Sequence, residues 1–331
     1  DNIHYPGTYL AGGYNRLKTE IAGKIVKNES LVNMPNWLLL NFRIEDEDWF
    51  DLSQVEIRFY RQELDIKNGI LHRIIRFVDK EGRETRMLER RLVHMEQKHL
   101  AALEMIVDPV NWSGRLEVRS ALDGEIKNDG VERYKGLSNR HLEILETKEI
   151  DKETTLLEIR TNQSKLVVAF AARVMLYRNK ESTTFEKTVS KDHGCIAQHF
   201  VVDLTKGERL VIEKVVSLFT ARDHAISECA LEAKLRVADV GRFSALLQTH
   251  ALEWKRIWRR FEIELGLEDP KENYYAQRIL RLYAFHLHQT ESKNTVELDV
   301  GIPARGCHGE AYRGLFFWDT LVILTVLNHL L

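Results

Sequence analysis

The segment from residue 301 to residue 320 is crowded with side chains that can do chemistry. Four glycines reduce its bulk, while a Glu, a Tyr, an Arg and the pair Trp318-Asp319 lie close together. A loop of this kind is costly to order unless it binds something. An indole can cover the apolar face of a pyranose, and a carboxylate can accept hydrogen bonds from its hydroxyls. The residues alone leave an alternative open, in which Trp318 begins a buried helix and Asp319 caps it.

Several histidines outside this segment have spacings that invite a metal-site interpretation. His193, Cys195 and His199 have loosely metal-like spacing but lack a fourth ligand, so ordinary packing is the better interpretation. His286 and His288 are two residues apart on a predicted helix and point to different faces. The sequence therefore predicts no metal site.

Composition and charge exclude several classes of protein. Lys and Arg number 48, Asp and Glu number 50, and the two signs are interleaved, which argues against nucleic-acid binding. No apolar run reaches the roughly 20 residues that a membrane span requires. The first nine residues lack the basic flank and apolar core of a secretion signal. Cys195, Cys229 and Cys307 read as reduced thiols, so we expect a cytoplasmic protein.

The first two thirds of the chain read as β-structure, because short runs alternate apolar and polar residues. Glycine-containing turns separate these runs. The stretch from Leu166 to Tyr177 is almost continuously apolar, as expected of a strand buried between two sheets. Together these features predict a large antiparallel sandwich. The alternating runs cover residues 55–59, 116–119, 156–160 and 209–215, and the turns cover residues 67–69, 79–82 and 122–124.

The pattern becomes helical after about Arg222. Apolar residues recur three or four apart up to Phe261, and Gly241 predicts a break between two helices. Gly266 and Pro270 are expected to act as stop signals. A third helix is predicted from about residue 272 to residue 290, followed by a nearly all-apolar helix over residues 316–331. One side of the third helix carries Ile279, Leu282, Tyr283 and His286.

The string from Gly309 to Asp319 resembles the signature of glycoside hydrolase family 65, which includes the maltose, trehalose and kojibiose phosphorylases. The family pattern Gly-Glu-x-Tyr-Arg-Gly-x-x-Phe-Trp-Asp lies in the first helical hairpin of an (α/α)6 barrel, and this chain matches every fixed position. Residues 5–9, 12–15 and 31–37 also look like the family's N-terminal domain. The resemblance is strongest to members fused to a β-phosphoglucomutase-like domain.

The resemblance implies a fold that is mainly β with a helical C-terminal part. We expect a galactose mutarotase-like antiparallel β-super-sandwich over residues 1–221. A helical linker would follow over residues 222–269. Residues 270–331 would then be the first helices of an incomplete (α/α)6 barrel.

The resemblance also implies roles for individual residues. Trp318 and Asp319 would contact the non-reducing glucose, while Tyr312 and Arg313 would line that subsite or order its loop. Family members usually carry a His before Phe-Trp-Asp and often an acidic residue after it. Here those places hold Leu315 and Leu321, a departure that bears on substrate recognition.

The implied activity is inverting phosphorolysis of an α-glucosyl disaccharide to give β-glucose 1-phosphate. One carboxylic acid must protonate the glycosidic oxygen while phosphate attacks the opposite face. In the family, that Glu and the phosphate-binding loop lie further along than Leu331. We therefore expect a fragment with no catalytic residue of its own, and Glu310, the nearest carboxylate, to order its loop rather than act as the acid.

The remaining expectations concern cofactors, partners and rival functions. The parent enzyme would need no metal or organic cofactor, would take a disaccharide with phosphate as co-substrate, and would form a homodimer. A trehalase-like hydrolase on the same scaffold is the nearest alternative. A non-catalytic carbohydrate-binding or structural fragment is the alternative from a different class.

Overall fold

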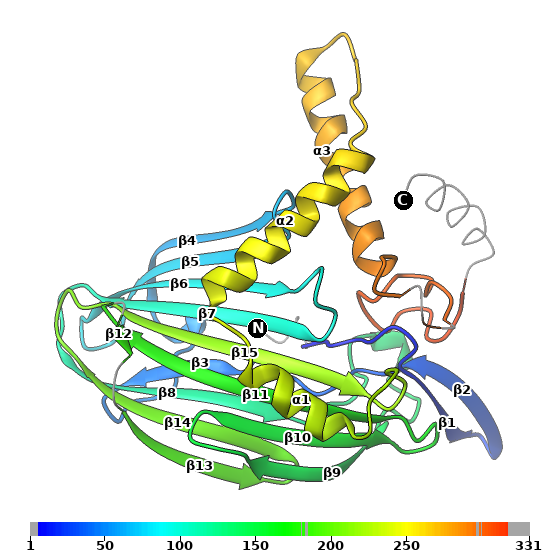
Figure 1. Ribbon diagram of the computed structural model, residues 1–331, viewed down its shortest axis with the longest axis horizontal. Coiled ribbons are helices and arrows are strands. Elements are labelled where there is room, and N and C mark those ends of the chain that lie inside the picture. Colours follow the sequence, from blue (N-terminus) through cyan, green and yellow to red (C-terminus); the bar gives the residue numbers. More distant parts are fainter. Residues whose placement is uncertain (1–5, 180, 183–184, 296–297, 299, 317–331) are drawn as a thin grey trace.

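Most of the chain folds into antiparallel β-sheets, as the alternating runs predict (Figure 1). The computed structural model describes residues 6–179, 181–182, 185–295, 298 and 300–316. The largest sheet of the described residues is nine-stranded and the next is four-stranded. The nine-stranded sheet contains, in order, β4 (Glu56–Asp65), β5 (Ile70–Val78), β6 (Glu84–Val93), β7 (Leu100–Pro109), β15 (Leu210–Thr220), β11 (Val167–Arg178), β10 (Thr154–Thr161) and β9 (Leu142–Glu149), with β12 (Glu181–Ser182) paired to β11. The four-stranded sheet contains β13 (Glu186–Asp192), β14 (Cys195–Leu204), β8 (Gly114–Asp123) and β3 (Leu40–Ile44), and a separate hairpin pairs β1 (Tyr14–Ile21) with β2 (Lys24–Leu31).

The main core lies between the nine-stranded and four-stranded sheets. Phe42 and Val118 enter it from the smaller sheet, and Val107, Phe170 and Ile212 enter it from the larger one. All five side chains are buried. Two sheets that bury one face each against the other form a sandwich, which is the predicted architecture.

The apolar strand β11 is buried on both faces, but its second cover differs from the one predicted. Val168 and Phe170 face the main core. Ala169 and Ala171 face a second apolar cluster with α1 (Cys229–Ala238), so the cover is a helix rather than a second sheet. Alanines on that face of the strand leave room for a helix to lie close against the sheet.

The strand β4 is present where the alternation predicts one, but it is not half-buried. Ile57 is 46% exposed and Phe59 is 48% exposed. β4 is the edge of the nine-stranded sheet and pairs only with β5. Alternation therefore predicted the strand correctly and its burial wrongly, because burial depends on what covers the sheet at that edge.

One lysine lies wholly inside the core. Lys214 on β15 is buried, and its Nζ donates to the backbone oxygens of Ala121 at 2.7 Å and Leu39 at 3.0 Å. Burial lowers the pKa of Lys214 to about 7. This side chain links the larger sheet to the smaller one through backbone carbonyls.

The helices follow the sandwich in the chain, and two of them stand above it in the view of Figure 1. Gly241 separates α1 from α2 (Phe243–Phe261), as predicted. Pro270 is not a stop signal, since it is the first residue of α3 (Pro270–Thr290). The Asp269 side chain accepts hydrogen bonds from the backbone N–H groups of Lys271 and Glu272. Proline suits the first position of a helix because it lacks an N–H, and an N–H there would have no partner within the helix.

The predicted side of α3 faces outward in the described structure. Tyr283 is 67% exposed and Ile279 is 50% exposed, whereas Phe285 and His288 are buried. Phe285 stacks on Trp254 of α2, with ring centroids 4.6 Å apart. Of the predicted helix over residues 316–331, only Phe316 lies within the described residues, and it forms a β-bridge with Pro303.

Candidate functional site

The signature loop, residues 301–316, closes on itself. The Ala304 N–H donates to the Leu315 oxygen at 3.0 Å, beside the bridge between Pro303 and Phe316. Figure 1 shows this loop in orange-red next to the end of the sandwich that carries β1 and β2. A methyl group on Gly314 would lie 3.2 Å from Glu29 Cγ on β2, so glycine permits the close approach.

Glu310 fastens the signature loop to the sandwich. Its side chain is buried, and its Oε2 accepts a hydrogen bond from the Gly130 N–H at 3.0 Å. Its Oε1 accepts one from the Tyr9 hydroxyl at 3.2 Å. Burial raises the pKa of Glu310, although the hydrogen bonds from Gly130 and Tyr9 partly offset that effect. Both oxygens are occupied by sandwich groups, which is the arrangement of a residue that orders a loop.

Tyr312 and Arg313 meet Tyr134, which lies in the sandwich loop, residues 124–141 between β8 and β9. The Tyr312 N–H donates to the Tyr134 hydroxyl at 3.2 Å. The Arg313 guanidinium lies over the Tyr134 ring, 4.4 Å from its centroid. Tyr312 has φ +66° and Arg313 has φ +56°, so two consecutive non-glycine residues occupy the left-handed region.

A second arginine from the sandwich completes this contact. Arg133 donates to the Tyr134 hydroxyl at 3.0 Å and also lies over the Tyr312 ring, 5.4 Å from its centroid. Partial burial disfavours ionisation of Tyr134. The hydrogen bonds from Tyr312 and Arg133, with the positive charge of Arg133 and Arg313, nevertheless lower the pKa of Tyr134. The cluster is therefore rich in positive charge and in aromatic surface.

A small polar cavity of about 20 Å³ lies under the contact between the two loops. Its lining includes Asn28 on β2, His141, Glu310 and Arg313. The Oδ1 of Asn28 and the Nε2 of His141 are buried without a hydrogen-bond partner among the described residues. A polar cavity of this volume can hold one water molecule.

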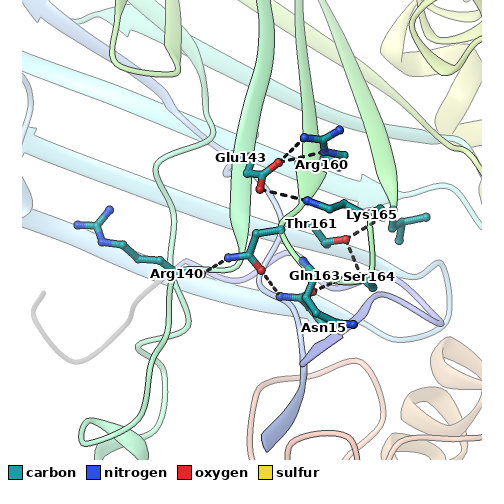
Figure 2. A network of polar contacts seen from close by, with 10 residues as sticks. Asn15, Arg140, Glu143, Arg160, Thr161, Gln163, Ser164 and Lys165 are labelled. Atoms are coloured by element: carbon teal, nitrogen blue, oxygen red, sulfur yellow. Dashed lines mark hydrogen bonds and ion pairs between the residues drawn. The ribbon is translucent and has the colours of Figure 1, made fainter. Parts of the chain in front are cut away.

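The base of the sandwich loop is held by a buried amide network around Asn15 of β1 (Figure 2). The Asn15 Nδ2 contacts the Asn162 Oδ1 at 2.7 Å and the His141 Nδ1 at 3.0 Å. The Asn162 Nδ2 donates to the Arg140 oxygen at 2.9 Å. The Asn15 Oδ1 accepts from the backbone N–H groups of Gln163 at 3.1 Å and Ser164 at 2.9 Å.

This network also fixes the protonation of His141. Since the Asn15 Oδ1 is occupied by two backbone donors, its Nδ2 is the donor to the His141 Nδ1, and the imidazole proton lies on Nε2. Burial lowers the pKa of His141 to about 4. A neutral imidazole thus connects β1 to the end of the sandwich loop.

The signature loop is held on its other side by α3. His286 and His308 contact each other, with the Nδ1 of His286 2.9 Å from the Nε2 of His308. Burial and the neighbouring His286 lower the pKa of His308. The sequence interpretation compared His286 with His288 and missed His308, because 22 residues separate the partners and no local spacing marks them.

The residues with metal-like spacing do not converge. His199 contacts Glu117 at 3.0 Å and Ser190 at 3.2 Å, while His193 lies exposed in a turn. His288 packs edge-on against Phe261, away from His286, as expected. Within the described part of the chain, no three His, Cys, Asp or Glu side chains are grouped to hold a metal ion. Among these same residues, no helix is long and apolar enough to cross a membrane.

Of the four residues predicted to bind sugar, the structure places two. Tyr312 and Arg313 lie together against Tyr134. Trp318 and Asp319 lie outside the described residues.

Comparison with known sequences identifies relatives across almost the whole chain. The N-terminal domain of glycosyl hydrolase family 65 matches residues 1–257, and its central catalytic domain matches residues 281–329. An uncharacterized glycosyl hydrolase of Mycobacterium tuberculosis is 42% identical over 98% of this chain, which spans 24% of that protein. A kojibiose phosphorylase of Halothermothrix orenii is 25% identical over 96% of the chain, and a trehalose 6-phosphate phosphorylase of Lactococcus lactis is 27% identical over 97%. The chain spans 39% of each of these two phosphorylases.

The fold agrees with a solved structure. A putative kojibiose phosphorylase from the human microbiome superposes on 95% of this chain with a TM-score of 0.78 at 19% identity, and the chain covers 39% of it. This confirms the antiparallel sandwich followed by helices. With the N-terminal family domain matching most of the chain, and the signature loop inside the catalytic-domain match, the chain belongs to glycosyl hydrolase family 65.

Proposed function

We propose that this chain is part of an inverting disaccharide phosphorylase that splits an α-glucosyl disaccharide with phosphate and releases β-glucose 1-phosphate. The observation that carries the proposal is the catalytic-domain match over residues 281–329, since it includes the whole signature string. Relatives named as kojibiose phosphorylase and trehalose 6-phosphate phosphorylase support phosphate as the acceptor of the glucosyl group.

In this proposal the signature loop and the Trp318-Asp319 pair that follows it in the sequence form one wall of the glucose subsite. Asp319 accepts hydrogen bonds from adjacent sugar hydroxyls, and the indole of Trp318 covers an apolar sugar face. Tyr312 and Arg313 hold the loop in place through their contacts with Tyr134.

The general acid is proposed to come from outside these residues. Glu310 is an unsuitable acid because both of its oxygens accept hydrogen bonds from the sandwich. Inorganic phosphate is the co-substrate, without a metal or organic cofactor. The homodimer, the cytoplasmic location and the division at residues 221 and 269 remain predictions.

A phosphorolysis assay on the longer protein that contains this chain tests the proposal. The protein is incubated with phosphate and maltose, trehalose, kojibiose or nigerose, and with trehalose 6-phosphate. NMR spectroscopy identifies the released sugar and its anomer. β-Glucose 1-phosphate from one of these substrates supports the proposal.

Two outcomes of the same assay contradict it. Free glucose released at the same rate without phosphate indicates a hydrolase, an alternative favoured by the relative named as a glycosyl hydrolase. Binding of a sugar without turnover indicates a carbohydrate-binding protein. The 331-residue chain by itself is expected to release no glucose 1-phosphate from any of these sugars.

A further inference from the structure

We infer that Tyr134, in the sandwich loop, is a positioning residue for the glucose subsite, acting through the backbone of Tyr312 and Arg313. The inference rests on the proposed function, because the subsite belongs to the proposed phosphorylase. It adds a residue from the sandwich to a site otherwise formed by the barrel.

The first support is backbone strain at the point of contact. Tyr312 and Arg313 both have positive φ, at +66° and +56°. Residues with a Cβ seldom adopt this backbone conformation, and two such residues in succession persist only where surrounding contacts hold them. Strain of this kind concentrates at ligand-binding sites.

The second support is that Tyr134 supplies those contacts. Its hydroxyl accepts the Tyr312 N–H at 3.2 Å, and its ring lies under the Arg313 guanidinium at 4.4 Å. Arg133 donates to the same hydroxyl at 3.0 Å, which orients it. One side chain thus constrains both strained residues.

The third support is the rigidity of the elements on either side. Glu310 joins the signature loop to Gly130, and the Asn15 network holds the end of the sandwich loop (Figure 2). On the C-terminal side, the Ala304–Leu315 hydrogen bond and the bridge to Phe316 fix the exit of the loop. With both sides held, a backbone change at residues 312–313 stays within the signature loop and displaces Tyr312 and Arg313, the two proposed subsite residues that the structure describes.

The central variant is Tyr134→Phe, which keeps the ring under Arg313 and removes the acceptor of the Tyr312 N–H. In the longer protein we expect kcat/KM for the disaccharide to fall about tenfold, through a higher KM for the disaccharide. The KM for phosphate should not change. In the 331-residue chain, hydrogen exchange at the Tyr312 amide should accelerate about tenfold.

Tyr60→Phe is the matched control. The Tyr60 hydroxyl also makes a hydrogen bond, to Gln62 at 2.9 Å, but it lies on the exposed edge strand β4. This variant should leave both KM values and the exchange of the Tyr312 amide unchanged.

The two measurements separate the inference from the proposed function. If the unsubstituted longer protein splits no disaccharide with phosphate, the proposed function is wrong, and the subsite role of Tyr134 is wrong with it even where amide exchange accelerates. If phosphorolysis occurs and Tyr134→Phe leaves kcat/KM unchanged, only the inference is wrong. Equal rises in the KM values for phosphate and disaccharide would also overturn it, since a loss of general stability does not single out the sugar.

Discussion

Replacing Glu310 with Gln distinguishes a loop-ordering residue from a catalytic acid. Glu310 is 5% exposed, and its two oxygens accept from the Gly130 N–H at 3.0 Å and the Tyr9 hydroxyl at 3.2 Å. A glutamine keeps one oxygen for Gly130, and its amide N–H₂ can donate to the Tyr9 oxygen if that hydroxyl rotates. Glu310→Gln should therefore cost at most about 1 kcal/mol of stability.

Glu310→Ala provides the larger structural perturbation. It leaves the Gly130 N–H without its partner and opens space between the two loops, so the free energy of unfolding should fall by about 1–3 kcal/mol. Chemical denaturation of the 331-residue chain measures both variants against the wild type. The expected order of stability at pH 7 is wild type close to Gln, with Ala clearly below both.

The pH dependence gives an independent check on Glu310. Burial raises its pKa, so the folded protein binds this proton more tightly than the unfolded chain does. The free energy of unfolding of the wild type should therefore fall as pH rises above 4.5, the ordinary pKa of a glutamic acid, and the Gln variant should lack that loss. With rising pH, the stability of the Gln variant relative to the wild type should therefore increase.

Turnover of the longer protein decides the functional question. If Glu310 only orders the loop, Glu310→Gln should keep kcat within about threefold of the wild-type value. A general acid would lose about 10²–10⁴-fold on the same change. A loss in that range, with unfolding stability preserved, would refute the loop-ordering role.

Three further predictions follow from other residues. In the longer protein, Asp319→Ala should lower kcat/KM by at least about 10²-fold, because two charge-assisted hydrogen bonds to sugar hydroxyls are lost, and the melting temperature should change little. If Asp319 instead caps a helix, the same substitution should cost about 1 kcal/mol of stability and leave catalysis unchanged. Lys214→Met should stabilise the chain at pH 7 by about 1–4 kcal/mol, because the ammonium is no longer buried. That gain should shrink from pH 7 toward the ordinary lysine pKa of 10.5, where the unfolded chain also loses the proton, and denaturation across this range measures it. The pKa of His141 is about 4 in the folded protein and 6.5 ordinarily, so the unfolded chain binds the proton first as pH falls. The free energy of unfolding should therefore fall by about 3 kcal/mol between pH 6.5 and pH 4 because of this residue. His141→Asn should lose less stability over that pH range in the same experiment, and an equal loss would contradict this assignment.

Local patterns in the sequence were enough to predict the β-structure, the helices α1 to α3 and the family. A strand shows a period of two and a helix a period of 3.6 in any environment, so the runs at residues 116–119 and 156–160 became β8 and β10. The break at Gly241 appeared where predicted. The signature string could also be read directly, because family 65 requires those residue types at fixed spacing.

Local signals failed where two structures share one residue type. A proline in the sequence can mark either the end of one helix or the first residue of another. Only the capping hydrogen bonds of Asp269 show that Pro270 begins α3. Alternation in residues 55–59 is typical of a half-buried strand, yet β4 lies uncovered at a sheet edge. The near-continuous apolar run of β11 implies two covered faces without revealing that α1 covers one of them.

The candidate site depends most on contacts that no local pattern contains. The resemblance to family 65 pointed to Tyr312 and Arg313 as candidate site residues, and that role stays a prediction. Their partner Tyr134 lies 178 residues before Tyr312, and Gly130 lies 180 residues before Glu310. Periodicity reports only which neighbours share a face, whereas contacts across such separations arise when complete sheets and loops pack. Folding therefore decides which sandwich residues support the signature loop, whereas the types of side chain within the loop are given by the sequence itself.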